Sequence, residues 1–483
     1  MDIRYNDLRE WLADLDEKGE VRTVSNGSIN EEIPALVDWI CHQDESPALL
    51  IDNMTGGENK LNLRFVCNIF GSSERLGYTF GLTARDKMSL VKEWKGKLNK
   101  EQQIPYKVVQ DGPILKNQVI GDDIDLTTLP IPKWHDRDGG PYVGTGNVVV
   151  TRDPDNDWVN LGTYRGQILS KNSVGNYVEP GKHAKLHREK WWALGKPAPI
   201  ALVLGCDPLL FVFSSTHSHE DVCEYNLAGG LRGRPTEVVV SDLTGLPIPA
   251  TAEIVLEGFL YPGDTDEEGP FGEWTGYYAK EVQQEPVLRV ERILYRDNPI
   301  IHAHPPVKPP STLTLSRAVE KSAEIWKALE DVGVPDVRGV WCHEAGGTRL
   351  FNIISIKQRY AGHSKQAALI ASQCNEGVRM GRYVVVVDED IDPTNLGEVI
   401  WAMSTRTDPE KSIDIIRRTY NAPLDPAMPE GQKLFTSRAI IDACRPFEWK
   451  DKFPPVIETD REQIRLVQEK YKHLLDKRSP VKS

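Results

Sequence analysis

Two glutamates flank a short turn in this sequence and are its best candidates for acid–base chemistry. The turn runs from Glu268 to Glu273 and reads Glu-Gly-Pro-Phe-Gly-Glu, with Trp274 directly after it. Because glycine and proline fix a tight turn, both carboxyl groups can face one cleft. Neighbouring carboxyl groups do not both ionise easily, so one is expected to stay protonated near neutral pH, as a general acid requires. The alternative is a solvated acidic loop, since three more acids lie in residues 264–267.

Histidines and acids gather at two further places with spacings typical of metal sites. A His-x-His pattern on a strand places both rings on one face, where they can hold a metal. The spacing alone therefore leaves a two-histidine metalloenzyme open as a rival hypothesis. That rival requires a His217→Ala variant to lose bound metal. The residues concerned are His217, His219, Glu220, Asp221 and Glu224 in one segment, and His302 and His304 in the other.

Three glycine-rich stretches do not fit nucleotide-binding motifs. Residues 144–146 lack the third glycine of the dinucleotide fingerprint and precede a valine-rich strand. Residues 175–182 resemble a phosphate loop but have one residue too many, and His183 stands where Ser or Thr should hold magnesium. Residues 227–230 lead into a strand where a helix should begin. Nucleotide binding by these motifs is rejected, and no Gly-x-Ser-x-Gly nucleophile motif is present.

The composition narrows the class of protein. A chain of 483 residues suggests two or three domains, and its net charge of −13 disfavours nucleic acid and anionic membranes as partners. The seven cysteines are scattered and form no Cys-x-x-Cys pair, which indicates a reducing compartment and no zinc ribbon. No apolar run approaches a membrane span, and the first residues do not resemble a signal peptide. We therefore expect a cytoplasmic protein with no membrane partner.

The elements that must position these residues divide the chain into three expected domains. The first, residues 1–125, has the pattern of an α/β domain. We expect helices over Leu8–Leu15 and Leu82–Leu98, and strands over Ala48–Ile51 and Leu61–Ile69.

The second domain, residues 126–305, consists of short β-rich runs with few helices. This sequence pattern favours an antiparallel barrel over a doubly wound sheet. The expected strands are Asn147–Thr151, Ile200–Leu204, Leu209–Phe213, Glu237–Val240 and Ile254–Leu260.

The third domain, residues 306–483, begins with a long linker helix whose apolar stripe runs from Leu315 to Val332. Strands and helices then alternate, which indicates a compact α/β or α+β sandwich. The tail opens with a capping box, Thr459-x-x-Glu462, before a terminal helix whose apolar stripe can dock on another subunit or pack on its own domain. Expected strands are Leu350–Ile356 and Tyr383–Val387, expected helices are Lys365–Asn375 and Asn395–Met403, and the terminal stripe is Ile464, Val467, Tyr471 and Leu474.

A series of motifs, in order and at fitting distances, resembles the UbiD family of decarboxylases, which use prenylated FMN. The likeness covers nearly the whole chain, and several ordered motifs together are specific where one alone is not. The resemblance implies a multidomain α+β fold with an N-terminal α/β domain, a central split β-barrel of the flavin-reductase type that binds the cofactor, a linker helix and a C-terminal α/β oligomerisation domain. The motifs lie at residues 129–132, 139–142, 160–165, 180–183, 204–208, 249–258, 268–273 and 276–278.

The resemblance implies a divalent metal on the cofactor phosphate, Mn²⁺ or Mg²⁺, with K⁺ as a further candidate. The family takes its ligands from an asparagine five residues before the catalytic arginine, a histidine eighteen after it and a later glutamate. Asn160, His183 and Glu224 match this pattern. An amide oxygen, an imidazole and a carboxylate form a mixed, fairly hard donor set that suits these ions. On this reading His217 and His219 do not bind the metal directly.

The resemblance also assigns a catalytic network to Arg165, Glu268 and Glu273. An arginine can hold one carboxylate with two parallel hydrogen bonds and orient a second glutamate. We take Glu273 as the proton donor and Glu268 as the residue that holds Arg165, although the roles can be exchanged because coupled acids titrate together. Phe271 and Trp274 either wall the substrate pocket or pack in the core.

Further cofactor contacts follow from the same resemblance. Residues 376–379 offer no lysine for the cofactor phosphate, so Lys365 or Arg382 is expected to take that place. The full set of expected cofactor-binding residues is Thr145, Asn160, Gly162, Thr163, Arg165, Lys182, His183, Ser214, Ser215, Thr216 and Glu224.

The implied reaction is the reversible, non-oxidative decarboxylation of an aromatic or heteroaromatic acid through a covalent prenylated-FMN adduct, with a glutamic acid as proton donor. The expected partners are this acid and CO₂, a flavin prenyltransferase that supplies the cofactor, and further copies of the chain in a homodimer or homohexamer. The substrate stays open among hydroxybenzoates, pyrrole- or indole-type acids, acrylates and thioester-linked aromatics. The alternative is a flavin- or metal-binding protein that uses His217 and His219 without decarboxylase chemistry.

Overall fold

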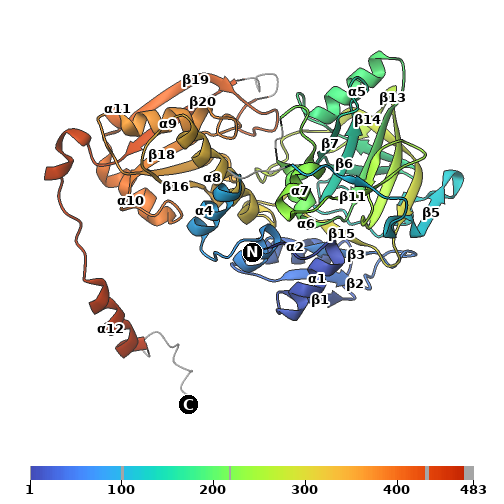
Figure 1. Cartoon of the computed structure of the whole chain (residues 1–483), viewed down its shortest axis with the longest axis horizontal. Helices are drawn as coiled ribbons and strands as arrows, with labels where there is room; N and C mark the ends of the chain where they lie inside the picture. Colours follow the sequence, from blue (N-terminus) through green and yellow to red (C-terminus); the bar gives the residue numbers. More distant parts are fainter. Residues whose placement is uncertain (1, 99–102, 217–218, 430–434, 473–483) are drawn as a thin grey trace.

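The computed structural model describes residues 2–98, 103–216, 219–429 and 435–472, and Figure 1 shows the course of the chain. The N-terminal unit packs helices against a four-stranded sheet with the order β1-β2-β3-β15. Strand β15 (Ile300–Ala303) pairs in parallel with β3, so the chain returns to this sheet after the central unit. The other elements are α1 (Leu8–Glu17), β1 (Val21–Ser25), α2 (Glu32–Cys41), β2 (Ala48–Asp52), β3 (Arg64–Cys67), α3 (Ser73–Phe80) and α4 (Lys87–Leu98).

Two elements of this unit are shorter than the sequence pattern suggests. The strand expected over Leu61–Ile69 covers only Arg64–Cys67. The helix expected over Leu82–Leu98 begins at Lys87. The preceding helix α3 ends at Gly81, whose φ of +64° closes its last turn, so the next residues form a link.

The central unit is built on an eight-stranded sheet in which every neighbouring pair is antiparallel. The order is β7-β6-β10-β13-β14-β9-β8, with β5 also paired to β14. The antiparallel sheet agrees with the sequence prediction. Among the described strands the path is open, because its end strands β7 and β8 do not pair, and no closed barrel forms. The strands are β5 (Asn117–Ile120), β6 (Asn147–Arg152), β7 (Val159–Gly162), β8 (Gly166–Ser170), β9 (Ser173–Asn176), β10 (Ala198–Leu204), β13 (Ile254–Glu268) and β14 (Gln283–Tyr295).

Helices and a small sheet flank this large sheet. The small sheet has the order β12-β11-β4. These elements are β4 (Lys107–Val108), β11 (Glu237–Val240), β12 (Pro247–Pro249), α5 (His183–Ala193), α6 (Pro208–Ser215) and α7 (Glu224–Arg232), with the 3₁₀ turns η1 (Pro113–Lys116), η2 (Gly121–Asp123) and η3 (Leu126–Thr128).

The run Leu209–Phe213 is a helix, so the prediction of a strand there is wrong. Asp207 accepts a hydrogen bond from the backbone N–H of Leu209 at 3.0 Å, and Pro208 occupies the first helical position. Both features start a helix. A short apolar run does not by itself separate a buried strand from a buried helix, and here the cap at its start decides.

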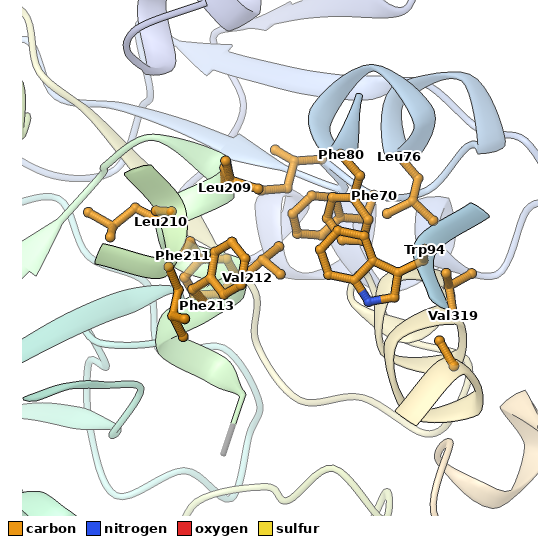
Figure 2. Close-up of a cluster of buried hydrophobic side chains, with 14 of the residues drawn as sticks. Phe70, Leu76, Phe80, Trp94, Leu209, Leu210, Phe211, Val212, Phe213 and Val319 are labelled. Atoms are coloured by element: carbon orange, nitrogen blue, oxygen red, sulfur yellow. The ribbon is translucent and has the colours of Figure 1, made fainter. Parts of the chain in front are cut away.

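An apolar cluster that joins the three units holds α6 in place. Figure 2 shows Phe80 and Trp94 of the N-terminal unit beside Phe213 of α6 and Val319 of α8 (Thr314–Asp331). The ring centroids of Phe80 and Trp94 are 4.5 Å apart, and those of Trp94 and Phe213 are 6.3 Å apart. Because packed cores are rigid, this cluster fixes the end of α6 that carries three predicted cofactor contacts.

The C-terminal unit contains a mixed five-stranded sheet with the order β16-β17-β18-β20-β19. Strands β17, β18 and β20 run parallel, and the two edge pairs are antiparallel. The expected alternation of strands and helices is present. The elements after α8 are β16 (Val337–Cys342), η4 (Glu344–Gly346), β17 (Phe351–Ile356), α9 (His363–Gln373), β18 (Tyr383–Asp388), α10 (Leu396–Arg406), α11 (Pro409–Ser412), β19 (Ile413–Tyr420), β20 (Phe435–Ala443), η5 (Phe447–Lys452) and α12 (Arg461–Tyr471).

The terminal helix α12 lies away from the rest of the chain in Figure 1. Asp460, and not Thr459, caps it by accepting a hydrogen bond from the N–H of Gln463 at 3.0 Å. Of its predicted apolar stripe, Val467 is 54% exposed, and Leu474 falls outside the described residues. Packing of this helix on its own domain is therefore wrong, and docking on another subunit stays a prediction. In the described part of the chain no helix combines the length and apolarity that crossing a bilayer requires.

Candidate active site

The two glutamates of the predicted turn lie at the end of the long β13–β14 hairpin. Glu268 is the last residue of β13 and pairs with Gln283 at the start of β14. The chain between them, residues 269–282, forms the hairpin loop that carries Glu273. Both glutamates are buried, at 1% and 8% exposure, so the solvated-loop alternative does not hold.

The turn itself is clamped by its neighbours. The N–H of Gly269 donates to Gln167 Oε1 at 2.8 Å, and the N–H of Gly139 donates to the carbonyl oxygen of Pro270 at 2.8 Å. Gly269 has a φ of +95°, which glycine adopts easily. A side chain at Gly139 would place its Cβ 2.0 Å from the Gly269 carbonyl oxygen, so this close approach requires glycine there.

Arg165, in the link between β7 and β8, joins both glutamates. Its Nε and Nη2 donate to the two carboxylate oxygens of Glu268 at 2.9 and 2.7 Å, and its Nη1 donates to Glu273 Oε1 at 2.5 Å. The side chain of Arg165 is only 9% exposed. The structure thus brings together the three residues predicted to form the catalytic network. Glu268 receives the bidentate contact, and Glu273 receives a single one.

The two carboxyl groups occupy different electrostatic surroundings. Burial raises the pKa of Glu273 to about 7, with Glu179 and Glu268 adding repulsion and Arg165 opposing the shift. Burial disfavours the charged form of an acid, so Glu273 holds a proton over much of the neutral range. Glu273 also lines the cavity described below, whereas Glu268 lies behind Arg165. This asymmetry suits Glu273 as the acid and Glu268 as the residue that holds Arg165.

Aromatic side chains pack around Arg165 and Glu268 and hold them in place. The Tyr142 hydroxyl donates to Glu268 Oε1 at 2.8 Å, and burial raises the pKa of Tyr142 so that the hydroxyl stays protonated. The Phe271 ring stacks on Tyr142 with centroids 3.9 Å apart. The guanidinium of Arg165 lies 4.5 Å from the centroid of the Tyr177 ring. These contacts fix the guanidinium in one orientation.

The network faces a cavity of about 240 Å³ between the central and C-terminal units. Phe271 and Trp274 both line it, as one of the two readings of the sequence predicts. Thr145 and Thr163, two predicted cofactor contacts, also line it. Its other lining residues include Arg165, Tyr177, Glu179, Lys182, Phe211, Ser215, Glu273, His304, Leu313, Thr314, Arg317, Thr348, Arg349 and Leu424.

A second cavity of about 110 Å³ adjoins the first and contains the predicted metal ligands. His183 Nδ1 lies 3.1 Å from Asn160 Oδ1, and Glu224 Oε2 accepts a hydrogen bond from the Leu161 N–H at 2.8 Å. Burial lowers the pKa of His183, which favours the neutral imidazole that binds metals. The buried Asn160 Nδ2 has no hydrogen-bond partner in the described part of the chain. Amide, imidazole and carboxylate donors around one cavity fit a hard divalent cation.

The remaining predicted cofactor contacts surround the same two cavities. Thr163, Lys182 and Ser215 line both, so they mark where the cavities join. Burial and the charge of Arg379 lower the pKa of Lys182 to about 7. The others, Gly162, Ser214 and Thr216, line the second cavity.

In the second cavity the third domain contributes Arg379, and neither Lys365 nor Arg382, the two residues predicted for this place, lines it. Arg379 lines the second cavity together with the predicted metal ligands. Lys365 is 53% exposed and pairs with Asp414 at 2.9 Å, whereas Arg382 pairs with Asp425, and neither lines either cavity.

The buried side chain of Arg438 explains the direction of Arg379. It donates to the carbonyl oxygens of Gly377, at 2.7 Å, and of Val378. These contacts fix the loop after α9, which therefore presents Arg379 to the cavity.

The histidine-based rival finds little support. His217 lies outside the described residues, and His219 lines the second cavity. His302 and His304 are buried beside Phe211, with ring centroids 5.3 and 5.4 Å from it. Within the described ranges, the grouped His, Cys, Asp and Glu side chains that could share a metal are Asp38, Cys41 and His42, far from this pair in sequence. Among the residues that the structure describes, the His302–His304 pair therefore belongs to no group of three such side chains.

Several residues of the two cavities and of the shell around the glutamate turn are not predicted from the sequence. Tyr142 and Gln167 hold the glutamate turn, and the first of them stands in a motif that the resemblance includes. Arg317, Arg349 and Arg379 come from the C-terminal unit, where nothing in the local pattern separates them from surface arginines. Only the packing of that unit on the central one reveals them.

Comparison with family models matches the three domains of 3-octaprenyl-4-hydroxybenzoate carboxy-lyase, UbiD. The N-terminal domain matches residues 12–96, the Rift-related domain residues 107–309 and the C-terminal domain residues 315–443. A phenolic acid decarboxylase of Bacillus subtilis (strain 168) is 31% identical over 458 residues, which cover 92% of this chain and 93% of that protein.

Solved structures with the same fold cover nearly the whole chain. The vanillic acid decarboxylase of Sedimentibacter hydroxybenzoicus in its closed form is 30% identical, with a TM-score of 0.82, over 98% of this chain and 100% of that one. An evolved dimeric form of the UbiD-class enzyme HmfF from Pelotomaculum thermopropionicum, in complex with prFMN, is 26% identical, with a TM-score of 0.80, over 96% and 100% of the two chains.

Proposed function

The chain belongs to the UbiD family of carboxy-lyases, and from that premise we propose that it catalyses the reversible, non-oxidative decarboxylation of an aromatic or heteroaromatic carboxylic acid with prenylated FMN. The observation that carries this proposal is the buried Arg165 held by Glu268 and Glu273 in the wall of a cavity. The relatives named above include decarboxylases of phenolic and vanillic acids, and HmfF was solved with prFMN.

The cofactor and the protein divide the chemistry between them. When bound, prenylated FMN supplies the electron sink for the loss of CO₂ through a covalent bond to the substrate carbon. Arg165 uses three of its five N–H groups on the two glutamates, so two remain to anchor the substrate carboxylate. With its pKa raised to about 7, Glu273 is protonated in a large fraction of the molecules near neutral pH, and it donates this proton to the carbon from which CO₂ has left. Glu268 orients Arg165 through its bidentate contact.

Part of the cavity wall is apolar, which limits the water around Arg165 and Glu273. Apolar side chains of Phe211, Phe271, Trp274, Leu313 and Leu424 line it. A dry site strengthens the contacts of Arg165 and preserves the raised pKa of the acid.

The second cavity has the donors for the phosphate end of the cofactor. Asn160, His183 and Glu224 would hold a divalent cation, Mn²⁺ or Mg²⁺, whose charge would offset that of the phosphate. Arg379 adds a positive charge from the C-terminal unit, which supports the binding of a dianion in a chain of net charge −13. Ser214, Thr216 and Lys182 are proposed to contact the same end of the cofactor.

The roles of the three domains are proposed from the membership of the UbiD family. Residues 1–125, 126–305 and 306–483 act as N-terminal, cofactor-binding and oligomerisation domains. The eight-stranded sheet of the second serves as a split barrel, and the exposed α12 supports assembly into a dimer or hexamer. A flavin prenyltransferase supplies the cofactor.

The test is a screen of carboxylic acids after co-expression with a flavin prenyltransferase. Purified protein should carry a modified flavin by absorbance, contain a divalent metal and release CO₂ from at least one aromatic or heteroaromatic acid. Protein made without the prenyltransferase serves as the control and should release none. Full flavin loading with no CO₂ from any acid, and no exchange of labelled bicarbonate into the corresponding decarboxylated products, would contradict the proposal.

A further inference from the structure

Two arginines in the wall of the larger cavity have no hydrogen-bond or ion-pair partner for their side chains in the part of the chain that the structure describes. Arg317 lies in the first turns of α8, and Arg349 lies between η4 and β17. Both side chains line the cavity that contains Arg165 and Glu273. Neither forms an ion pair or side-chain hydrogen bond with a described residue. Partly buried charges without partners are costly, so the pair is expected to have a ligand.

The position of Arg349 relates it to the proposed proton donor. Its guanidinium lies 4.8 Å from the ring centroid of Trp274, the residue after Glu273. Gly347 lets this contact form, since a Cβ there would lie 2.8 Å from the Trp274 ring. Thr348 has a φ of +61°, which a β-branched side chain rarely adopts. Strained backbone of this kind is typical of binding and catalytic loops, and here it lies directly beside Arg349.

The charges of the two arginines favour an anion. Burial and the neighbouring Arg349 lower the pKa of Arg317 to about 10, and burial lowers the pKa of Arg349. Both groups therefore stay charged at neutral pH and repel each other, and the nearby acids Glu179, Glu320 and Glu376 oppose this repulsion only in part. The start of α8, at Leu313 and Thr314, lines the same cavity, and the N-terminal end of a helix adds positive potential.

The acids near the two arginines are shared with other cations or are not ionised. Glu179 lines the cavity and acts on Arg349, but it also acts on Lys182. Glu376 pairs with Lys321, and burial raises the pKa of Glu320 to about 8. Arg165 is already matched by Glu268 and Glu273, and Glu273 holds a proton over much of the neutral range. The proposed phosphate site lies in the second cavity with Arg379, so the cofactor phosphate does not account for Arg317 and Arg349. A substrate with one carboxylate would satisfy Arg165 alone.

We propose that the substrate is an aromatic or heteroaromatic diacid whose second carboxylate is bound by Arg317 and Arg349 while the first lies at Arg165. This inference rests on the proposed function and narrows its substrate class. Arginine suits the role because its planar fork can bind a carboxylate through two parallel hydrogen bonds. Aromatic acids that carry only one carboxylate would then be poor substrates.

The experiment compares matched ligands on the prenylated-FMN-loaded enzyme. Binding constants are measured from the absorbance change of the bound flavin for the three benzenedicarboxylates and the corresponding pyridine diacids, for their monoamides, and for the parent monoacids. A monoamide keeps the size of the diacid and removes one charge. We expect at least one diacid to bind about tenfold or more tightly than its monoamide, which corresponds to about 1.4 kcal/mol. CO₂ release from the same acids is recorded in parallel.

Variants then locate the effect. Arg317→Gln and Arg349→Gln should each reduce the ratio of diacid to monoacid kcat/KM by about tenfold or more, mainly through KM. Arg338→Gln is the control, because Arg338 is an exposed arginine of β16 that pairs with Asp336. It should leave the ratio unchanged. Flavin absorbance and the unfolding temperature show that each variant is folded and loaded.

The outcomes separate this inference from the proposed function. CO₂ release from monoacids at rates equal to those from diacids, or equal binding of diacids and their monoamides, would overturn the diacid inference and leave the decarboxylase proposal intact. Loss of bound flavin in folded Arg317→Gln and Arg349→Gln proteins would instead assign the two arginines to the cofactor. CO₂ release from no acid in the panel, or in the wider screen, would count against the proposed function itself.

Discussion

Replacing Glu273 with glutamine tests the central claim that this residue is the proton donor. The change keeps the size and the hydrogen-bond acceptor that faces Arg165 Nη1 but removes the proton that the acid can give. General-acid catalysis contributes roughly 10²- to 10⁴-fold in rate. We therefore expect kcat of Glu273→Gln to fall by at least about a hundredfold, with flavin content unchanged because Arg165 keeps its two bonds to Glu268.

The same residue predicts the pH dependence of the wild-type rate. With its pKa raised to about 7 by burial, Glu273 is protonated below that pH and loses its proton above it. The rate of CO₂ release should therefore fall as the pH rises from about 7 to 9, approaching tenfold for each pH unit. A residue with the ordinary pKa of an exposed glutamate would be ionised throughout this range.

The raised pKa of Glu273 also predicts that the stability of the folded protein falls as the pH rises. Between pH 4.5 and about 7 the folded chain binds the Glu273 proton while the unfolded chain releases it, so stability falls as the pH rises through this window. The shift of roughly 2.5 pKa units corresponds to about 3 kcal/mol of unfolding free energy. Glu273→Gln should lack this contribution and lose less stability than wild type between pH 5 and 8.

The assays are CO₂ release across pH 6–9, flavin absorbance and chemical unfolding at pH 5 and 8. Glu267→Gln is the matched control and should behave like wild type. Glu267 is an exposed acid near the end of β13, the strand that leads into the loop that carries Glu273. Turnover by loaded Glu273→Gln within tenfold of wild type, or a wild-type rate that is flat from pH 6 to 9, would refute the assignment of the donor.

Three further substitutions test the second cavity and the support of the glutamate pair. Arg379→Gln should weaken flavin binding about tenfold to a hundredfold, because hydrogen bonds to charged groups contribute about 1.5–3 kcal/mol, while Lys365→Gln should have no effect in the same titration. His183→Ala should lose bound divalent metal by elemental analysis and His219→Ala should keep it; the reverse result would favour the two-histidine rival. Tyr142→Phe should lower the unfolding free energy by about 1–3 kcal/mol in a denaturant titration at pH 7, since it removes a donor to a buried carboxylate, and an unchanged value would show that this bond adds no stability.

Local sequence patterns predicted many of the elements and the glutamate turn, whereas the family resemblance supplied Arg165 and the metal ligands. The glycine and proline between Glu268 and Glu273 predict a tight turn, and the turn is present with both acids directed at Arg165. The long apolar stripe of α8 predicts its helix. Such signals work because turns, caps and amphipathic stripes depend on residues a few positions apart. Where they conflict, as in the apolar run Leu209–Phe213, the helix cap at Asp207 decided the outcome.

Only the tertiary structure decided which basic residues enter the cavities. Arg379 and Lys365 both lie in or near α9 and look alike in sequence, yet one faces the metal ligands and the other is exposed. Arg317 and Arg349 come from a helix and a loop more than thirty residues apart and meet at one wall of the cavity. Their positions depend on how the C-terminal unit packs on the central one. That packing depends on contacts between residues distant in sequence, which no local pattern records.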